Sequence, residues 1–524
     1  MITLLDYGAG NVRSVINALE RLGAKVKTVQ RPEDISSAEK LVFPGVGAFG
    51  NMMHVLNRKG YVSPLISYIT AGRPFLGICL GLQALFDGSE EDPGVPGLGI
   101  IPGIVKRFGT GLPVPHIGWN GFKAQQPSIL FRGMHGDEKF YFVHSYHAVT
   151  TDKSWVLSTT DYGGKFVSAV QRGPVAAVQF HPEKSGTHGL GILKNFLEFN
   201  AEPVMPPTAI RSGPLAKRII ACLDVRTDEG GRLVVTKGDR YDVRENGLIR
   251  NLGKPEDLAK RYYEEGADEI TFLNITGFRN LPLKDMPMLD VLKRTSENVF
   301  VPLTIGGGIR DYTDLDGIHY SALEMAEAYF RSGADKISIG SEAVNIVETC
   351  IETGRPTGRS AIEGISRIYG SQAVVISIDP RRVYVSSPED VPHHVIETVF
   401  RGPRGERYCW YQCTTGGGRQ KRDLDAVTVA RMSEKLGAGE ILLNCIDRDG
   451  TNEGFDLELI NAVTDNVGVP VIASSGAGAA QDFFDVFTET RASAALAAGV
   501  FHRGELSIKE VKKHLSGKVE VRSI

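Results

Sequence analysis

The stretch GADEITFLNIT, residues 266–276, recurs in altered form as GAGEILLNCID at residues 437–447. A second pair repeats with nearly the same separation, VPLTIGGGI at 301–309 and VPVIASSGA at 469–477. In each copy a glycine-containing turn borders a short apolar run, which is the pattern of a buried β-strand. An internal repeat of this length indicates that the second part of the chain is built from two similar halves.

The two halves together predict eight strands. We expect them at about 218–224, 269–274, 300–305, 335–340, 373–379, 440–446, 469–474 and 493–498. Eight β/α units in about 300 residues fit a single (β/α)8 TIM barrel. A doubly wound sheet is the weaker alternative, because it does not require two matching halves. The long, irregular segment 381–421 is expected to be an enlarged loop after the fifth strand, on the catalytic face.

Residues 1–200 alternate short apolar strands with helical stretches, the pattern of an α/β domain. The next stretch, AEPVMPPTAIRSGP at 201–214, is rich in proline and lacks apolar periodicity, so it is typical of a linker. We therefore divide the chain into an α/β domain at 1–200, a linker at 201–216 and a barrel at 217–524.

The composition is that of an ordinary globular protein, with 42% hydrophobic and 23% charged residues. A formal net charge of −3 argues against a nucleic-acid or membrane-surface protein. Six cysteines in 524 residues do not make a disulfide scaffold, which favours a reducing, cytoplasmic compartment. MITLLDYGAG at the N-terminus predicts a strand and a glycine turn rather than a signal peptide. A plastid is the alternative, if a transit peptide was removed.

The stretch GICLGLQALF, residues 77–86, places Cys79 between two glycines in an apolar run. Three interpretations compete: a buried core cysteine, a metal or redox thiol, and a catalytic nucleophile. Gly-x-Cys-x-Gly after a strand and before a helix is typical of a nucleophile elbow. QFHPEKSG at 179–186 offers His181 as a base and Glu183 to orient it, and the turn PGVGAFG at 44–50 offers backbone N–H groups. With these partners, catalysis becomes the favoured interpretation.

The first 200 residues resemble the class I glutamine amidotransferases, specifically the glutaminase partner of imidazole glycerol phosphate synthase. The motifs that carry the resemblance are DYGAGN, PGVGAFG, GICLGLQ, PHIGWN, YFVHSY and QFHPEKSG. The resemblance implies that Cys79, His181 and Glu183 form the triad that hydrolyses glutamine. It also implies an oxyanion or glutamine-binding role for four further residues: Gly45, Val46, Gly47 and Gln83. An ordinary helix position is the alternative for Gln83.

In the barrel, the two halves end strands one and five with Asp224 and Asp379. Barrel chemistry lies at strand C-termini, where two carboxylates can act as acid and base on one substrate. Two helix-capping aspartates are the alternative. Glycine-rich stretches after strands three, four, seven and eight favour catalysis, because their backbone N–H groups can approach phosphate oxygens. Two pairs related by the repeat predict a ligand with a phosphate at each end.

The second unit resembles the cyclase half of the same synthase family through AKRIIACLDV, VPLTIGGGIRD, GADKISI, ILLNCIDRDGT and AALAAGVFH. The resemblance implies the fused bifunctional form, which makes imidazole glycerol phosphate and an aminoimidazole carboxamide ribotide from a bisphosphate ribonucleotide in histidine biosynthesis. It implies no metal or organic cofactor, no nucleic acid or membrane partner, and a monomer with an intramolecular domain interface. The phosphate- or substrate-binding residues predicted for this unit are Lys237, Gly307, Gly308, Gly340, Ser341, Asp449, Gly450, Ser475, Gly476, Ala498 and Gly499.

Gly340 and Ser341 stand where many relatives have Asn-Thr, so the exact phosphate donors there stay open. Asn274 and Asn444 also differ from prokaryotic relatives, and neither is assigned a catalytic role.

Four predicted strands begin with a charge at the expected bottom of the barrel: Arg218, Glu269, Lys336 and Glu440. A structural salt-bridge plug is one interpretation, and the family resemblance assigns these positions to an ammonia gate instead.

Two alternatives to the synthase remain at this stage. One is the sister isomerase of the same pathway, which has no use for ammonia. The other is a degenerate regulatory scaffold, against which the complete Cys-His-Glu set and both aspartates argue.

Overall fold

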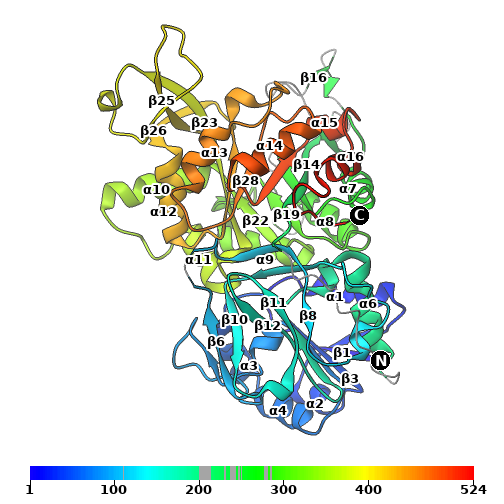
Figure 1. The fold of residues 1–524 in the computed structure, drawn as a ribbon. Coiled ribbons are helices and arrows are strands. Elements are labelled where there is room, and N and C mark those ends of the chain that lie inside the picture. Colours follow the sequence, from blue (N-terminus) through cyan, green and yellow to red (C-terminus); the bar gives the residue numbers. More distant parts are fainter. Residues whose placement is uncertain are drawn as a thin grey trace.

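In the computed structural model of the chain, the described residues are 1–109, 111–199, 214–228, 232–236, 251–275, 281, 283 and 286–523, with the backbone of 244–245 and 248–249. Two units are stacked on each other, the N-terminal one in blue and cyan below the C-terminal barrel (Figure 1).

The N-terminal unit is built on one mixed sheet. In spatial order its first five strands are parallel neighbours, the next three pairings are antiparallel, and the last pairing is parallel again. In spatial order the strands are β2 (Val26–Thr28), β1 (Ile2–Leu4), β3 (Lys40–Gly45), β4 (Phe75–Cys79), β13 (Val175–Val178), β12 (Lys165–Arg172), β10 (Tyr146–Thr150), β6 (Gly103–Arg107) and β5 (Gly88–Ser89). Beside it lie β11 (Val156–Asp161), β8 (Lys123–Ala124) and the separate pair β7 (His116–Asn120) and β9 (Phe140–His144). The helices are α1 (Val12–Arg21), α2 (Pro32–Ser36), α3 (Phe49–Arg58), α4 (Val62–Thr70), α5 (Leu80–Gln83) and α6 (Gly186–Leu197).

The C-terminal unit is a closed barrel of eight parallel strands, which confirms the predicted fold class. The strands are β14 (Arg218–Thr227), β18 (Glu269–Asn274), β19 (Leu303–Gly306), β22 (Lys336–Ile339), β23 (Val374–Val385), β27 (Glu440–Asn444), β28 (Val471–Ser474) and β29 (Ala494–Ala497). Pairing of β22 with β23 closes the circle. The surrounding helices are α7 (Pro255–Glu264), α8 (Pro287–Ser296), α9 (Ala322–Ser332), α10 (Ser341–Thr353), α11 (Ala361–Tyr369), α12 (Ala426–Leu436), α13 (Leu457–Thr464), α14 (Ala480–Glu489), α15 (Gly499–His502) and α16 (Ile508–Leu515).

The repeated Gly-Ala motif ends a helix and starts the following strand. Gly437 caps the C-terminus of α12 in the left-handed conformation, with φ 107°. Gly333 does the same for α9, with φ 118°. These backbone angles suit glycine because it has no Cβ, so the motif fixes where each helix stops.

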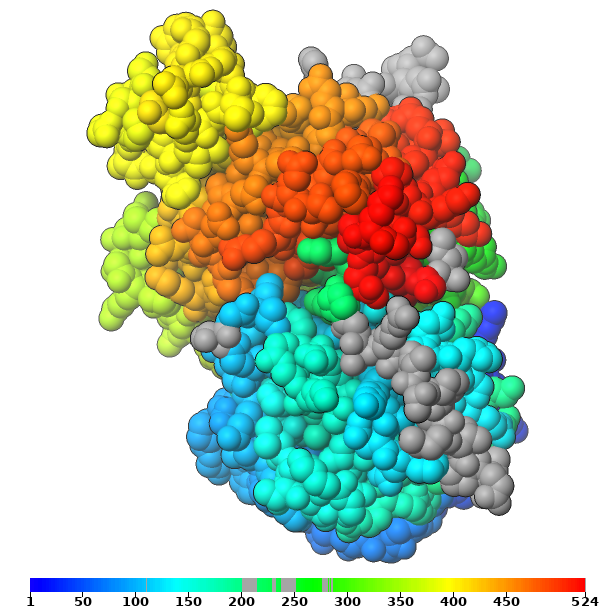
Figure 2. All heavy atoms as spheres, viewed as in Figure 1, coloured from blue at the N-terminus to red at the C-terminus, as the bar shows by residue number. Residues whose placement is uncertain are grey.

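Segment 381–421 follows the fifth barrel strand and reaches the catalytic face, as expected, but it is a sheet and not an irregular loop. Strand β23 continues past the barrel to Val385 and pairs antiparallel with β25 (Tyr408–Thr415). Strand β25 also pairs with β24 (Val395–Glu397) and β26 (Gln420–Asp425). We call residues 380–425 the excursion; it stands out from the barrel in both overall views (Figures 1 and 2).

The excursion is anchored by Arg382. Its guanidinium donates to both carboxylate oxygens of Asp456, at 2.9 and 2.7 Å, and to the Tyr411 hydroxyl at 2.8 Å. These contacts join two excursion strands to the start of α13, so the excursion is held as a rigid sheet on the barrel.

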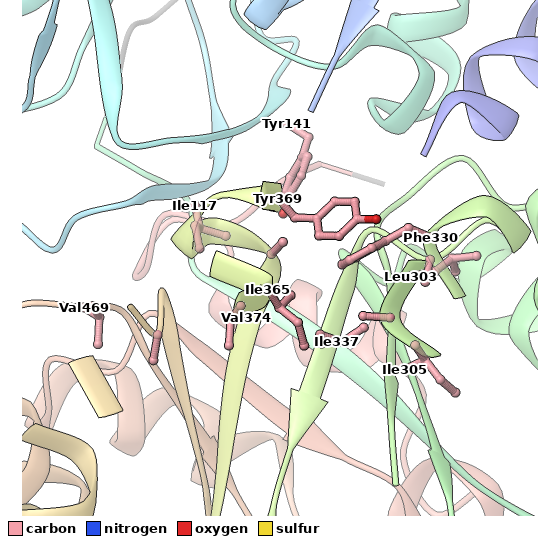
Figure 3. Packing of buried hydrophobic residues seen from close by; sticks show 14 of the residues in the cluster. Ile117, Tyr141, Leu303, Ile305, Phe330, Ile337, Ile365, Tyr369, Val374 and Val469 are labelled. Atoms are coloured by element: carbon pink, nitrogen blue, oxygen red, sulfur yellow. The ribbon is translucent and has the colours of Figure 1, made fainter. Parts of the chain in front are cut away.

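One continuous hydrophobic cluster spans both units. Ile117 and Tyr141 of the N-terminal unit lie beside Ile365 and Tyr369 of α11 (Figure 3). The last residues of the predicted linker are part of this contact, because the Ala216 N–H donates to the Trp119 carbonyl at 3.0 Å. The unit boundaries at 200 and 216 stay our proposal.

Asp268 ties the C-terminal end of the chain to the barrel floor. Its fully buried carboxylate accepts from Lys512 at 2.6 Å, Arg522 at 2.7 Å and the backbone N–H of Ile219 at 2.9 Å. Burial, together with nearby Arg522, lowers the pKa of Lys512 to about 7, and Asp268 opposes that shift.

We expect Asp268→Ala to lower the free energy of unfolding by about 3 kcal/mol, since it leaves buried cations without their counter-charge. Denaturant unfolding followed by circular dichroism measures the change. The matched control is Asp465→Ala, whose exposed pair with Arg491 is expected to contribute less than about 1 kcal/mol. Equal losses in the two variants would contradict the anchoring role.

Candidate active sites

Cys79 lies at the junction of β4 and α5 in a strained backbone conformation. Its φ of 55° and ψ of −105° are unusual for any residue other than glycine. The flanking glycines are required by space: a Cβ at Gly77 would lie 2.6 Å from the Gly81 carbonyl oxygen, and one at Gly81 would lie 2.0 Å from that of Phe43. This is the geometry of a nucleophile elbow.

His181 and Glu183 form a buried pair beside this elbow. The His181 Nδ1 lies 2.7 Å from the Glu183 Oε1, and both residues are buried. Burial works against a charge on His181, but the Glu183 carboxylate and the Cys79 thiol together hold its pKa well above the ordinary value. The pair can therefore accept a proton and stabilise the resulting imidazolium.

The strand segment with Gly45, Val46 and Gly47 runs next to Cys79 and against the barrel. Gly45 pairs in register with Cys79. The Val46 carbonyl accepts from the Tyr7 hydroxyl at 2.6 Å. A Cβ at Gly47 would lie 2.7 Å from the carbonyl oxygen of Ile368 on α11. The barrel therefore packs directly on the predicted oxyanion segment.

A small pocket of about 20 Å³ joins Cys79, His181, Val46, Gly47 and Gln83. The Gln83 side chain faces this site, donating to Gln179 at 3.1 Å, and Gln179 in turn donates to the Cys79 sulfur at 3.4 Å.

The pocket wall also contains residues that the sequence analysis did not name, among them Glu91 and Gln372. Glu91 accepts from the backbone N–H of Phe49 at 2.8 Å, and burial raises its pKa to about 7. Gln372 belongs to the barrel and follows α11 in the chain. Neither lies in a recognisable motif, and only the fold brings them to the pocket.

A larger cavity of about 950 Å³ opens at the C-terminal ends of the barrel strands. Asp224 on β14 and Asp379 on β23 both line it, and both are largely buried. Asn444, to which the sequence analysis assigned no catalytic role, donates to Asp379 Oδ1 at 2.9 Å. Burial raises the pKa of Asp379, which favours its neutral form.

The same cavity collects the predicted phosphate loops. Its wall includes Gly307, Gly308, Gly340, Ser341, Asp449, Gly450, Ser475, Gly476, Ala498 and Gly499. Gly307 needs its φ of 97° and its missing Cβ, which would lie 2.2 Å from the Asn274 carbonyl oxygen. Gly476 approaches the Gly454 carbonyl oxygen in the same way, at 2.2 Å. Lys237, also predicted to bind substrate, lies outside the described residues.

The four predicted gate residues meet in one fully buried ring. Arg218 contacts Glu269 at 2.9 Å and also Glu440. Lys336 contacts Glu269 and Glu440 at 2.7 Å each. Because each side chain starts a barrel strand, the ring closes the N-terminal end of the barrel.

On the other side of the ring lies Tyr141 of the N-terminal unit. Burial, and then the Glu269 carboxylate, raise the pKa of Tyr141 well above its ordinary value. Its buried hydroxyl has no hydrogen-bond partner among the described residues. A polar atom without a partner therefore lies between the two sites.

No group of three His, Cys, Asp or Glu side chains in the described part of the chain is arranged to hold a metal ion. None of the described helices combines the length and apolar character needed to cross a bilayer.

Comparison with known proteins assigns a family to each unit. A family model described as "Glutamine amidotransferase class-I" matches residues 3–199, and one described as "Histidine biosynthesis protein" matches residues 218–507. The fold and the sites thus define a class I glutamine amidotransferase fused to a barrel of the histidine biosynthesis type.

Full-length relatives share this fusion. The chain is 58% identical over its whole length to "Imidazole glycerol phosphate synthase hisHF, chloroplastic" of Arabidopsis thaliana, covering 89% of that protein. It is 53% identical to "Imidazole glycerol phosphate synthase hisHF" of Emericella nidulans, with 99% of the chain and 98% of the relative covered. The single subunit HisH of Syntrophotalea carbinolica is 50% identical over 37% of the chain and 98% of its own length. The chain belongs to the imidazole glycerol phosphate synthase family, which excludes the sister isomerase.

We expect Glu183→Gln to lower the pKa of His181, because it removes the main charge that opposes the effect of burial. NMR titration of the histidine ring signals measures the shift. Glu90→Gln serves as the control, because Glu90 is an exposed carboxylate next to Glu91 in the sequence. This variant should leave the pKa of His181 unchanged. An unaltered His181 titration in Glu183→Gln would remove Glu183 from this role.

Proposed function

We propose that the chain is an imidazole glycerol phosphate synthase that makes ammonia from glutamine in one unit and consumes it in the other. The observation that carries the proposal is the buried ring of Arg218, Glu269, Lys336 and Glu440 between the two sites. A hydrolytic pocket on one side and an open cavity with two carboxylates on the other make sense together if a small neutral molecule passes between them.

In the first unit the Cys79 sulfur attacks the side-chain amide carbon of glutamine while His181 takes the thiol proton. Backbone N–H groups near Gly45–Gly47 stabilise the oxyanion. The C–N bond then breaks, His181 returns the proton to the leaving nitrogen, and ammonia departs from a thioester. Water, deprotonated by His181, hydrolyses the thioester to glutamate. Glu183 holds the imidazole in position and stabilises its charged form.

Glu91 is suited to bind the α-ammonium group of glutamine. It is a buried carboxylate in the wall of the Cys79 pocket, and burial raises its pKa to about 7. A cation in the pocket would favour its ionised form. Gln83 lies on the same wall and would contact the amide or carboxylate end.

In the barrel the substrate is phosphoribulosyl-formimino aminoimidazole carboxamide ribonucleotide, with a phosphate at each end. The loops at Gly307–Gly308 and Gly340–Ser341 hold one phosphate, and those at Ser475–Gly476 and Ala498–Gly499 hold the other. Asp449, Gly450 and Lys237 complete the binding site. The cavity of about 950 Å³ has the size for such a ligand.

Asp224 and Asp379 move protons while ammonia adds to the ketone, the imidazole ring closes and the aminoimidazole carboxamide ribotide leaves. The raised pKa of Asp379 suits it to donate a proton, with Asn444 fixing its orientation. Asp224 would then accept one. When a proton must return in another step, Asp224 and Asp379 exchange these roles, so that each ends the reaction in the protonation state in which it began.

We further propose a monomer, with the units divided at 1–200, 201–216 and 217–524. The compartment is a reducing one, either the cytoplasm or a plastid. The six free cysteines support a reducing compartment, and the chloroplastic Arabidopsis relative supports the plastid.

Cys79→Ala should abolish product formation from glutamine but retain it from ammonium salts at high pH, because the thiol acts only in making ammonia. Asp379→Asn should lose both by at least about a hundredfold, since a positioned proton donor is removed. A steady-state assay with each nitrogen source compares them. Glutamine-dependent turnover in Cys79→Ala, or normal ammonium-dependent turnover in Asp379→Asn, would contradict the roles.

Lys336→Ala should lower the ratio of product formed to glutamine hydrolysed, because a gap in the ring lets ammonia escape or be protonated. The ratio is read from glutamate and product formed in the same reaction, with ammonium-dependent synthesis as the reference. Lys512→Ala removes another buried, salt-bridged lysine away from the ring and should keep the ratio. If Lys336→Ala also keeps one product per glutamine, the ring is only a structural plug.

A further inference from the structure

The tip of the excursion reaches one end of the barrel cavity, where a phosphate of the substrate is proposed to bind. Residues 415–420 form the turn between β25 and β26, and Thr415, Gly416, Gly417, Arg419 and Gln420 line the cavity of about 950 Å³. Three consecutive glycines, 416–418, have positive φ values, which tightens the turn. The backbone N–H of Gly416 donates to the Ser341 Oγ at 2.9 Å. The excursion thus touches one of the two proposed phosphate sites.

A second contact fixes the tip on the same helix. Arg422 on β26 donates from Nε to the Glu348 carboxylate of α10 at 2.8 Å, and a second N–H of its guanidinium contacts the other carboxylate oxygen. Helix α10 begins at Ser341, so it is held at its first residue and again two turns later. The position of the tip relative to the phosphate site is therefore set by two independent contacts.

This arrangement places the cation Arg419 in the wall of the cavity. It is exposed, and its guanidinium has no hydrogen bond or ion pair with any described residue. Arg422 is already paired with Glu348, and Arg503, at the opposite phosphate end, contacts Glu505 at 2.6 Å. Arg226 and Arg310 also line the cavity and, like Arg419, have no hydrogen bond or ion pair with a described residue. An arginine held beside a phosphate site and left without a counter-charge is suited to bind a phosphate oxygen.

We propose that Arg419 binds the phosphate group of the substrate held at Gly340 and Ser341, which makes the excursion part of the substrate site. This inference rests on the proposed bisphosphate substrate. It also accounts for the rigid attachment of the excursion, because a phosphate contact from a loosely held loop would lose much of its energy to ordering that loop. Arg419 touches no reacting atom, so it acts in binding and not in catalysis.

The test is ammonium-dependent synthesis with the full chain, measured over a range of bisphosphate substrate concentrations. Arg419→Gln should raise the KM for that substrate about tenfold and change kcat far less, since a phosphate contact remote from the chemistry contributes equally to ground and transition states. Arg419→Lys should restore part of the loss. Lys421→Gln is the matched control, because Lys421 is an exposed cation on β26, two residues after Arg419, that does not line the cavity.

The outcomes separate the two proposals. A wild-type chain that makes no product from ammonium contradicts the proposed function. A wild type that is active, with an Arg419→Gln KM within about twofold of its own, overturns the role of Arg419. An equal rise in Lys421→Gln overturns it as well, because the effect would then come from the net charge of the turn and not from a contact. A thermal unfolding scan confirms that each variant is folded.

Discussion

The buried ring of Arg218, Glu269, Lys336 and Glu440 is the interaction on which closure of the barrel depends. Removing four charges from water costs several kcal/mol per ion, and the cost is offset only if every charge is matched in good geometry. Here two cations and two carboxylates alternate, and Thr304 donates a further hydrogen bond to Glu269 at 2.6 Å. The four residues begin four different strands, so the ring can form only when the barrel is closed in the correct register. A hydrophobic plug would close the barrel as well, but it would not place charged groups near the buried Tyr141 of the N-terminal unit.

The barrel could be predicted from the sequence because its strands are short apolar runs repeated with fixed glycines at their ends. Gly333 and Gly437 end the helices that precede two of the strands, and the structure keeps the strand starts at Arg218, Glu269 and Glu440. The excursion could not be predicted in the same way. Its strands are held by distant partners, chiefly Arg382 with Asp456 and Tyr411, so local apolar alternation does not reveal them. The polar residues of this segment suggest a loop. They form a sheet because they hydrogen-bond to one another.

The site residues also divide into those that local motifs reveal and those that only the fold brings to the site. Cys79 could be proposed because the glycines that permit the elbow flank it directly. His181 and Glu183 could be proposed because the base and the carboxylate lie two residues apart in one motif. The aspartates could be proposed because they end equivalent strands. Glu91 and Gln372 could not, because neither lies in a motif and each reaches the pocket from a different element. Asn444 lies in the ILLNCIDRDGT motif, but its contact with Asp379 forms only when β27 pairs with β23. Gln372 comes from the other unit altogether, so only the packing of the barrel on the glutaminase site places it in that wall.

That packing has a consequence for how the pocket around Cys79 can admit a substrate. A space of about 20 Å³ holds little more than one water molecule, far less than an amino acid. Its walls therefore lie close around any substrate that enters. Two of them lie at the interface: Gly47, where even a methyl group would collide with the Ile368 carbonyl, and Gln372 just beyond α11. The neighbouring Ala48 N–H donates to the same Ile368 carbonyl at 3.2 Å. Opening the pocket thus requires displacing atoms that contact the barrel, and any shift of α11 within the barrel acts directly on the oxyanion segment. The wall of the Cys79 pocket and the barrel therefore share this contact.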